Sequence, residues 1–220
     1  MKDYRNLDQK ILGLRREYRW GKLEEKNLDP DPFKQFARWF EDALRAKVKS
    51  PNSMTLATAS RNTIPSARTV LLKGFDSDGF VFFSNYKSLK GKELASNPNA
   101  ALVFYWPELE RQVCVSGKVE KVSRRESLEY FNLRPLEARI AAWVSQQSQP
   151  VKSRELLERK FRILAKKFKS SPVPMPGSWG GFRLTPRSIE FWQGRENRLN
   201  DRLRYRRKSG SGWKIERIQP

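Results

Sequence analysis

Short runs of β-branched and aromatic residues follow one another closely along this chain, and this feature limits the fold most strongly. Turn-forming sequences such as Arg61-Asn62 and Asp76-Ser-Asp-Gly79 separate them. The runs do not alternate regularly with helices, as they would in a doubly wound parallel sheet. The sequence therefore predicts a mainly β fold of the α+β class, an antiparallel barrel with helices around it. The predicted strands cover residues 54–59, 67–73, 80–84, 100–106, 111–122, 181–185, 188–193 and 201–208, with a last run from Trp213.

Four segments have the spacing and the end signals of helices. Asp31 is a typical N-cap residue, and Pro32 stands at the first helical position. Ser123-Arg-Arg-Glu126 is a capping box that would open another helix. The helix that starts at Pro32 has an apolar stripe of Phe33, Phe36, Phe40 and Leu44 and is expected to stop at Ser50-Pro51. The other predicted helices cover residues 88–97, 123–134 and 154–168.

Residues 1–30 are predicted to form an N-terminal arm. Asp8 to Trp20 has helical spacing, and the linker Leu28-Asp-Pro-Asp-Pro32 would end it. Residues 31–220 are predicted to form a single domain, because a chain of 220 residues can bury a substantial core and shows no repeats.

The chain has no histidine, and this absence excludes several kinds of chemistry. Ser-His-Asp triads, histidine general bases and HExxH zinc sites all need it. Cys114 is the single cysteine, so no internal disulfide, four-cysteine zinc site or other metal site is expected. If the chain is an enzyme, a cofactor should supply the chemistry while Arg, Lys and Tyr supply position and charge. The single cysteine, the lack of a leader-like N-terminus and the lack of a long apolar run together predict a cytoplasmic protein.

The formal net charge is +21, from 45 Lys and Arg against 24 Asp and Glu. Such a field attracts nucleic acid, an anionic membrane or phosphorylated small molecules. Residues 187–217 alone carry ten basic and four acidic residues. However, the chain has no zinc finger, no G-x-x-x-x-G-K-[ST] loop, no G-x-G-x-x-G loop and no basic surface interleaved with aromatics. Composition alone favours nucleic acid modestly, and local sequence has to decide between these partners.

Eight short motifs lie in a fixed order along the chain. They are Leu14-Arg-Arg-Glu-Tyr18, Arg68-Thr-Val-Leu-Leu-Lys73, Phe83-Ser-Asn85, Glu110-Arg-Gln112, Tyr130-Phe-Asn-Leu-Arg-Pro135, Trp143-Val-Ser-Gln-Gln-Ser148, Ser178-Trp-Gly-Gly181 and Ile189-Glu-Phe-Trp-Gln-Gly-Arg-Glu-Asn-Arg-Leu-Asn-Asp-Arg202. Together they resemble the pyridoxine/pyridoxamine 5′-phosphate oxidase family. The resemblance implies an FMN-binding split β-barrel and a homodimer with FMN at the subunit interface. It also implies oxidation of pyridoxine and pyridoxamine 5′-phosphate to pyridoxal 5′-phosphate, with O2 as acceptor and H2O2 as by-product.

The resemblance also implies a set of FMN contacts. In the family, the Arg68 position contacts the FMN phosphate and the backbone through Leu72 runs along the flavin. Gln112 would bind the isoalloxazine ring, whereas Gln147 and Ser148 would reach the cofactor from the partner subunit. The full expected set is Arg68, Thr69, Val70, Leu71, Leu72, Lys73, Phe83, Ser84, Leu89, Lys90, Gln112, Gln147, Ser148, Trp192 and Arg202.

A second implied set would bind the substrate. Tyr130 and Arg134 lie four residues apart, so on a helix they share a face suited to a phosphate. Arg198 and Asn200 would touch the pyridine ring opposite the flavin as the catalytic pair. The full expected set is Arg15, Arg16, Glu17 and Tyr18 as a lid, with Lys73, Tyr130, Arg134, Ala138, Arg198, Leu199 and Asn200.

Three positions depart from the family pattern. Leu89 stands where the family commonly has arginine, Ala138 where it often has serine, and Asn200 where it usually has histidine. Asparagine can donate and accept hydrogen bonds but cannot carry a proton. The alternative hypothesis is therefore a catalytically impaired family member that binds FMN or pyridoxal phosphate.

Overall fold

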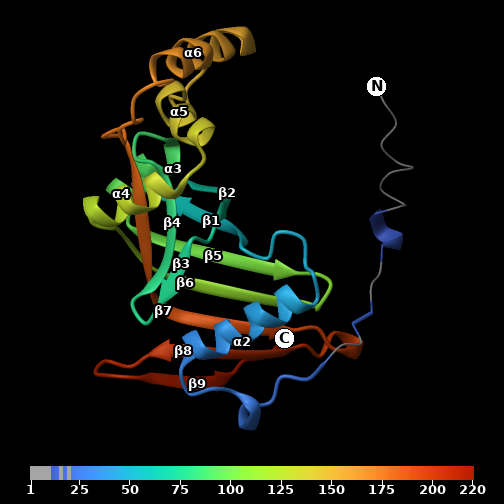
Figure 1. Cartoon of the computed structure of the whole chain (residues 1–220). Helices are drawn as coiled ribbons and strands as arrows, with labels where there is room; N and C mark the ends of the chain where they lie inside the picture. Colours follow the sequence, from blue (N-terminus) through green and yellow to red (C-terminus); the bar gives the residue numbers. More distant parts are fainter. Residues whose placement is uncertain (1–10, 15–16, 19–20) are drawn as a thin grey trace.

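The computed structural model describes residues 11–14, 17–18 and 21–220, and its strands form one curled antiparallel sheet (Figure 1). The sheet order is β2-β1-β5-β6-β7-β4-β3, and β8 pairs with both β7 and β9. The predicted mainly β, split-barrel fold is confirmed. The strands are β1 Ser53–Ala59, β2 Pro65–Leu71, β3 Gly74–Asp76, β4 Gly79–Asn85, β5 Asn99–Trp106, β6 Arg111–Lys121, β7 Trp179–Gln193, β8 Asp201–Arg207 and β9 Trp213–Arg217.

Strand β7 is one strand of 15 residues where the sequence predicted two. Its first half pairs with β4 and its second half with β8, while β6 accompanies both. The pairing with β6 shifts register between Ser116 and Gly117, opposite Pro186. Proline has no N–H to donate to a neighbouring strand. Pro186 lies where β7 stops pairing with β4 and before it begins to pair with β8, so it marks a change of partner strand and not the end of β7. A Cβ on Gly117 would lie 2.1 Å from the carbonyl oxygen of Thr185, so the bulge requires glycine.

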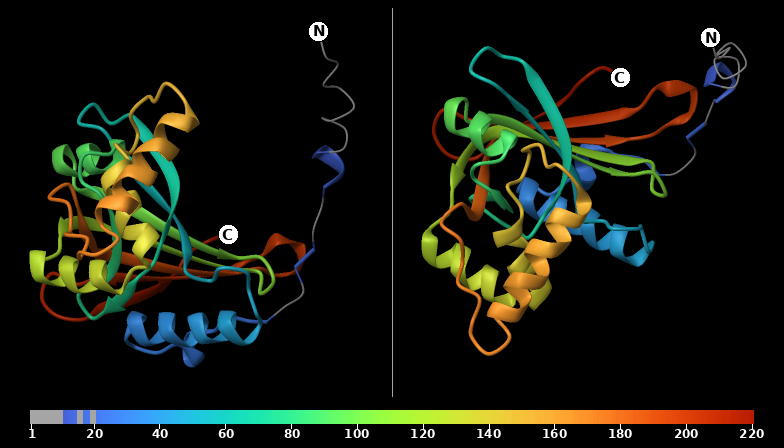
Figure 2. Two further views of the ribbon diagram at one scale, coloured as in Figure 1. Left: turned by 45° about the horizontal axis from the view of Figure 1, so that its top comes forward. Right: turned by 90° about the horizontal axis from the view of Figure 1, so that it is seen from above.

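Helix α2, Pro32–Arg45, packs against the concave side of the sheet (Figures 1 and 2). As predicted, Asp31 caps it by accepting a hydrogen bond from the N–H of Phe33. Phe36 is fully buried, with ring centroids of three strand phenylalanines 4.9–5.0 Å away. The helix ends at Arg45, before the predicted stop, and Leu44 is exposed instead of joining the apolar stripe.

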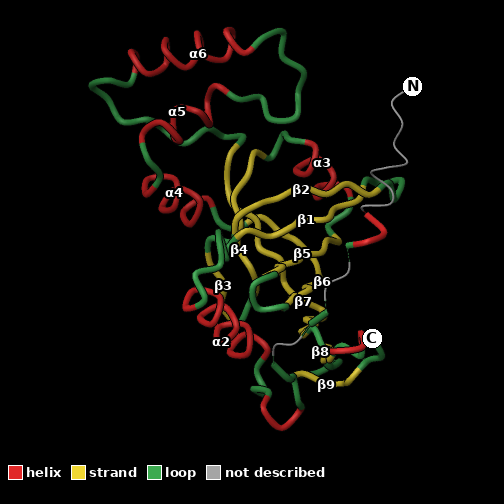
Figure 3. Tube along the Cα trace, turned by 90° about the vertical axis from the view of Figure 1, so that its right-hand side faces the viewer, coloured by secondary structure: helices red, strands yellow, loops and turns green. Residues whose placement is uncertain are grey.

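A second group of helices lies at the other end of the molecule from β8 and β9 (Figures 1 and 3). It contains α3 Leu89–Ser96, α4 Arg124–Leu133, α5 Leu136–Val144 and α6 Arg154–Lys167. Ser123 caps α4 as predicted, and Ser88 caps α3. Helix α5 was not predicted. Only Arg134 and Pro135 separate it from α4, and a proline after a helix usually marks the helix end. Phe131, Ile140 and Trp179 belong to a separate small core beneath these helices.

The N-terminal arm is less helical than predicted. Within its described part, residues 11–13 are helical, whereas 14, 17–18 and 21–24 are not, and the short helix η1, Glu25–Asn27, follows. The arm is attached to β9, because Arg217 forms an ion pair with Glu25 at 2.8 Å and donates to the carbonyl oxygen of Leu23. Among the described residues, no helix is long and apolar enough to cross a membrane.

Candidate functional site

A cavity of about 440 Å³ opens between β2, β4 and the corner that joins α4 to α5. Its volume falls within the range of small-molecule sites. Leu133, Pro135 and Trp179 also line it, although no binding role was predicted for them. The expected site residues that line it are Thr69, Val70, Leu71, Lys73, Phe83, Ser84, Lys90, Tyr130, Arg134, Ala138 and Gln147, and we call this set the cavity half-site.

Lys90 is the buried cation of the cavity half-site, with 8% of the residue exposed. Its Nζ donates to Oε1 of Gln147 at 3.0 Å, and Oγ of Ser84 donates to the same oxygen at 3.1 Å. Burial, and then the nearby Arg68, lower the pKa of Lys90. A buried ammonium that is bonded to a neutral amide favours an anionic ligand such as phosphate. Gln147 therefore lines the cavity of its own chain, and the expectation that it reaches the FMN of the partner subunit stays a prediction.

Arg68 lies beside this cluster and is paired with Glu93, which the sequence analysis missed. Nη2 of Arg68 is 3.3 Å from Oε2 of Glu93, and the hydroxyls of Thr58 and Ser66 join both side chains. Burial alone would raise the pKa of Glu93, but these hydroxyls and Arg68 outweigh it and lower that pKa. Glu93 is thus an anion that already neutralises Arg68. The pairing joins residues 25 positions apart, so no local pattern could reveal it.

Lys73, Tyr130 and Arg134 meet in the cavity as the phosphate-binding hypothesis requires. Nζ of Lys73 lies 5.8 Å from the centre of the Tyr130 ring. Cζ of Arg134 lies 4.8 Å from the ring of Trp179, and its buried Nη1 has no hydrogen-bond partner among the described residues. Burial lowers the pKa of Arg134 below its usual value. A guanidinium with a free, buried N–H is ready to bind an oxyanion.

Arg68 does not line the cavity, and neither do the side chains of Leu72, Leu89 and Ser148. Leu72 points into the main core, although its backbone exchanges hydrogen bonds with Asn52. Leu89 is exposed at the start of α3, and Ser148 is exposed with a φ of 70°. The side chain of Leu72 is thus not available to a ligand, and Leu89 forms no part of the cavity wall.

A second group of expected residues lies at the far end of β7. Gln112, Trp192 and Arg202 are direct neighbours across β6, β7 and β8. Nε of Arg202 donates to Glu190 at 2.8 Å, and its Nη1 donates to the carbonyl oxygen of Gln219 at 3.0 Å. These bonds fix the guanidinium against the sheet beside Trp192.

The loop of residues 194–200, which we call the signature loop, follows β7 and carries the expected catalytic pair. Asn197 and Arg198 have φ values of 56° and 60°, which non-glycine residues rarely adopt. Oδ1 of Asn200 accepts a hydrogen bond from the backbone N–H of Arg195 at 3.0 Å and closes the loop. Arg198 and Leu199 are exposed. We call this loop, together with Gln112, Trp192 and Arg202, the loop half-site.

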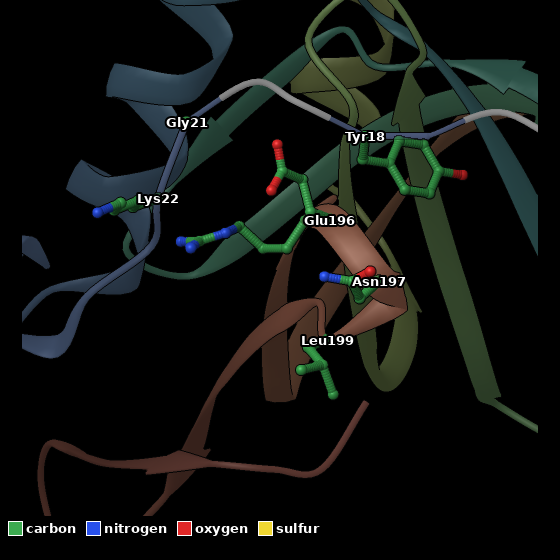
Figure 4. A pocket seen from close by; sticks show the side chains of 7 residues that line it. Tyr18, Gly21, Lys22, Glu196, Asn197 and Leu199 are labelled. Carbon is green, nitrogen blue, oxygen red and sulfur yellow. The ribbon is translucent and has the colours of Figure 1, made fainter.

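The arm contacts the loop half-site through Tyr18. Its ring lies edge-on to Trp192, with centroids 5.3 Å apart. A cavity of about 490 Å³ separates the arm, with Tyr18, Gly21 and Lys22, from the signature loop (Figure 4). Tyr18 of the expected lid thus lies beside the signature loop, whereas neither Arg198 nor Asn200 lines this cavity. Glu17 is described and exposed, while Arg15 and Arg16 lie outside the described residues.

Within one chain, the cavity half-site and the loop half-site lie at different stretches of β7. Gly181 lies opposite Phe83 in the cavity half-site, whereas Trp192 lies opposite Gln112 in the loop half-site. The intervening strand path is about 36 Å at about 3.3 Å per residue. The cavities of the two half-sites share no lining residue. The two half-sites therefore do not form one cavity within the chain.

Comparison with known families supports the resemblance drawn from the motifs. A family model described as Pyridoxamine 5′-phosphate oxidase matches residues 40–166. A second, described as Pyridoxine 5′-phosphate oxidase C-terminal dimerisation region, matches residues 179–220 and so contains the signature loop. The "Pyridoxine/pyridoxamine 5′-phosphate oxidase" of Rubrobacter xylanophilus is 55% identical over 210 residues, 96% of each chain. That of Burkholderia mallei is 55% identical over 212 residues, 96% of this chain and 99% of the relative.

Two solved structures are similar in fold. PhzG from Burkholderia lata 383, in complex with tetrahydrophenazine-1-carboxylic acid, matches with a TM-score of 0.86 and 29% identity, over 91% of this chain and 99% of that one. A pyridoxamine 5′-phosphate oxidase-related, FMN binding protein from Nostoc punctiforme matches with a TM-score of 0.69 and 20% identity, over 88% and 99%. The second likeness concerns the fold alone.

Proposed function

Because this chain belongs to the pyridoxamine 5′-phosphate oxidase family, we propose that it oxidises pyridoxine 5′-phosphate and pyridoxamine 5′-phosphate to pyridoxal 5′-phosphate. In this proposal O2 is the acceptor, H2O2 is the by-product, and the reaction takes place in the cytoplasm. Membership of the family makes the chain an oxidoreductase, and FMN is its cofactor.

One observation carries the choice of substrate. The residues that line the cavity half-site include three cations, Lys73, Lys90 and Arg134, and no Asp or Glu. A cavity of this kind suits two phosphate groups, one from the cofactor and one from the substrate. PhzG was solved with a carboxylic acid that has no phosphate, whereas the relatives at 55% identity are named for phosphorylated substrates.

The residues of the cavity fit FMN. Arg68 and Lys90 would hold its phosphate, and Ser84, Gln147 and the backbone of residues 69–72 would hold the rest of the molecule. The buried Lys90, whose Nζ is bonded to the neutral amide of Gln147, is the observation that supports this fit. When bound, FMN supplies the two-electron redox chemistry, and the protein supplies orientation and charge.

The loop half-site would come from the partner subunit in a homodimer. The matched dimerisation region, residues 179–220, contains Trp192, Arg198, Asn200 and Arg202. In this proposal each of two sites combines the cavity of one chain with Gln112, Trp192, Arg202 and the signature loop of the other. The separation of the two half-sites along β7 supports it. Tyr18 and the arm would then cover the substrate as a lid that excludes water.

Asn200 would orient the substrate without exchanging a proton. Its Oδ1 is already bonded to the backbone N–H of Arg195, so its Nδ2 is the group left to donate to a pyridine-ring substituent. Arg198 in the same loop adds positive charge beside it. Binding in a fixed pose is the main contribution that such groups make to the rate.

An absorbance spectrum and an oxygen electrode test the proposal. The purified protein should show flavin absorbance, and the FMN-loaded protein should consume O2 with pyridoxine or pyridoxamine 5′-phosphate while pyridoxal 5′-phosphate accumulates. Full FMN occupancy without O2 consumption on either substrate would refute the oxidase and favour the alternative, a binding protein that has lost catalysis.

A further inference from the structure

We propose that Trp179 is a positioning residue for the substrate phosphate, because it keeps the guanidinium of Arg134 turned into the cavity. The inference rests on the proposed function and deepens it, since it assigns a role to the Ser178-Trp-Gly-Gly181 motif. Trp179 does not itself need to touch the phosphate.

Trp179 begins β7 and is 7% exposed. Its ring lies nearly parallel to those of Phe83 and Tyr130, with interplanar angles of 13° and 10° and centroid distances of 5.3 and 6.2 Å. Phe83 and Tyr130 in turn stack at 4.1 Å. The edge contact of Trp179 with Phe131, at 5.1 Å, locks the indole from a further side. The indole is therefore a rigid surface within the cavity wall.

Arg134 rests on this surface. Its Cζ lies 4.8 Å from the indole ring, which attracts the guanidinium through a cation–π interaction. No ion pair of Arg134 occurs among the described residues, and its buried Nη1 has no hydrogen-bond partner there. A planar guanidinium stacked on a ring keeps its N–H groups in its own plane and available to an oxyanion. The indole thus orients Arg134 without neutralising it.

The two glycines of the motif make this packing possible. A Cβ on Gly181 would lie 2.8 Å from Cε1 of Phe83, and a Cβ on Gly180 would lie 2.0 Å from the hydroxyl of Tyr86. Larger residues would push Phe83 away from the indole. At the other side of the ring cluster, Lys73 lies over Tyr130. The same rings therefore support both cations that would hold the phosphate.

Binding of two inert ligands to the FMN-loaded protein tests the inference. 4-Deoxypyridoxine 5′-phosphate cannot be oxidised at C4′ and cannot form a Schiff base, and 4-deoxypyridoxine differs from it only by lacking the phosphate. Calorimetry would give the Kd of each for the wild type, Trp179→Phe and Trp179→Leu. We expect Trp179→Leu to raise the Kd of the phosphorylated ligand about tenfold. Trp179→Phe keeps an aromatic face and should raise it less, and the unphosphorylated ligand should bind alike to all three.

A double-mutant cycle then shows whether Trp179 acts through Arg134. In an Arg134→Met background, Trp179→Leu should cause no further loss of affinity for the phosphorylated ligand. Additive losses would overturn the inference, as would equal losses for both ligands or a wild type that does not prefer the phosphorylated one. If Trp179→Leu fails to fold, Trp179→Met replaces it in the same comparison with Trp179→Phe.

The outcome is separable from that of the proposed function. A wild type that prefers the phosphorylated ligand but consumes no O2 with pyridoxine 5′-phosphate refutes the oxidase and leaves the role of Trp179 open to the same cycle. Normal oxidase activity with an unchanged Kd in Trp179→Leu refutes the role of Trp179 alone.

Discussion

The side-chain oxygen of Asn200 is 3.0 Å from the backbone nitrogen of Arg195 and accepts its hydrogen bond. The bond spans the part of the signature loop in which Asn197 and Arg198 adopt left-handed φ values. Such backbone conformations persist only where neighbouring contacts enforce them. Asn200 therefore stabilises the signature loop, in addition to any contact that it makes with the substrate.

Replacing Asn200 by leucine should loosen the signature loop, and Arg198 would then be held less firmly for contact with the substrate. We expect kcat/KM for pyridoxine 5′-phosphate to fall about fivefold, since a part-buried hydrogen bond of this kind is worth on the order of 1 kcal/mol. Asn200→Asp is the matched control because it keeps the acceptor and should lose less. FMN content, measured by absorbance, should not change in either variant. A leucine variant with wild-type kcat/KM would contradict this account of the loop.

Replacing Asn200 by histidine should add a titration that the wild type lacks. The chain has no histidine. Its single thiol, Cys114, should not add a titration near neutral pH either, because burial and then Glu190 raise the pKa of that thiol above its usual value. Histidine titrates near pH 6.5. The ratio of the variant's kcat to that of the wild type should therefore change around pH 6.5, measured at saturating substrate from pH 5.5 to 8.5. A ratio constant over this range would show that position 200 exchanges no proton.

Removing Glu93 should destabilise the protein, because Arg68 would then be a largely buried charge without its partner. We expect Glu93→Ala to lower the free energy of unfolding of the FMN-free protein by about 3 kcal/mol. Glu93→Gln keeps an acceptor for Thr58 and Ser66 and should lose less. Saturating FMN should recover part of the loss, because its phosphate would offer Arg68 a new anion. Urea unfolding with and without FMN measures both effects, and equal losses in the two conditions would argue against phosphate binding at Arg68.

The sequence predicted the elements whose signals are local. Asp31 and Ser123 mark helix starts through their own side chains, and both cap as expected. Strand β7 was misread as two, because its continuity across Pro186 depends on a bulge in β7 opposite Ser116 and Gly117 of β6, about 70 residues earlier in the chain. The change of pairing from β4 to β8 along β7 depends on the whole sheet, so no local sequence pattern could predict it.

For the candidate site too, local motifs could be read from the sequence, whereas contacts that depend on the fold could not. Motif resemblance identified Lys73, Tyr130 and Arg134, which the fold brings into one cavity. It gave no role to Trp179, although the motif around it was visible, because the stacking of a guanidinium on an indole depends on the packing of α4 against β7. It also did not reveal that Gln147 bonds to Lys90 and Ser84 of its own chain, since the path of the chain after α5 cannot be read from composition.

Acid should release the arm from β9. The hydrogen bond from Arg217 is the main cause that lowers the pKa of Glu25 from 4.5 to about 2. A carboxylate with a lowered pKa stabilises the fold fully above its unfolded pKa and loses that contribution as pH falls toward the folded value. Glu25→Gln should therefore be less stable than the wild type at pH 5, and the difference should vanish toward pH 2. Because Glu25 is more than half exposed, the difference should stay near or below about 1 kcal/mol.

Thermal unfolding at several pH values measures this difference. Glu24→Gln is the control, because the described hydrogen bonds of Arg217 go to Glu25, Asp201 and the carbonyl of Leu23 and not to Glu24. A Tm difference between Glu25→Gln and the wild type that stays constant from pH 5 to pH 2 would contradict the assigned pKa.

Mixed dimers should reveal that the site is divided between two chains. Arg134→Met damages the cavity half-site and Arg198→Met damages the loop half-site, so each variant alone should lose most of its activity. In a heterodimer of the two, one site would receive both changes and the other neither. Random reassociation from equal amounts should therefore restore about a quarter of the wild-type activity, because half of the dimers would be mixed and half of their sites intact. Oxygen consumption after unfolding and joint refolding gives the measurement, with each variant refolded alone as the control. No recovery in the joint sample, when size-exclusion chromatography and mass spectrometry show mixed dimers, would place both half-sites of each active centre in a single chain.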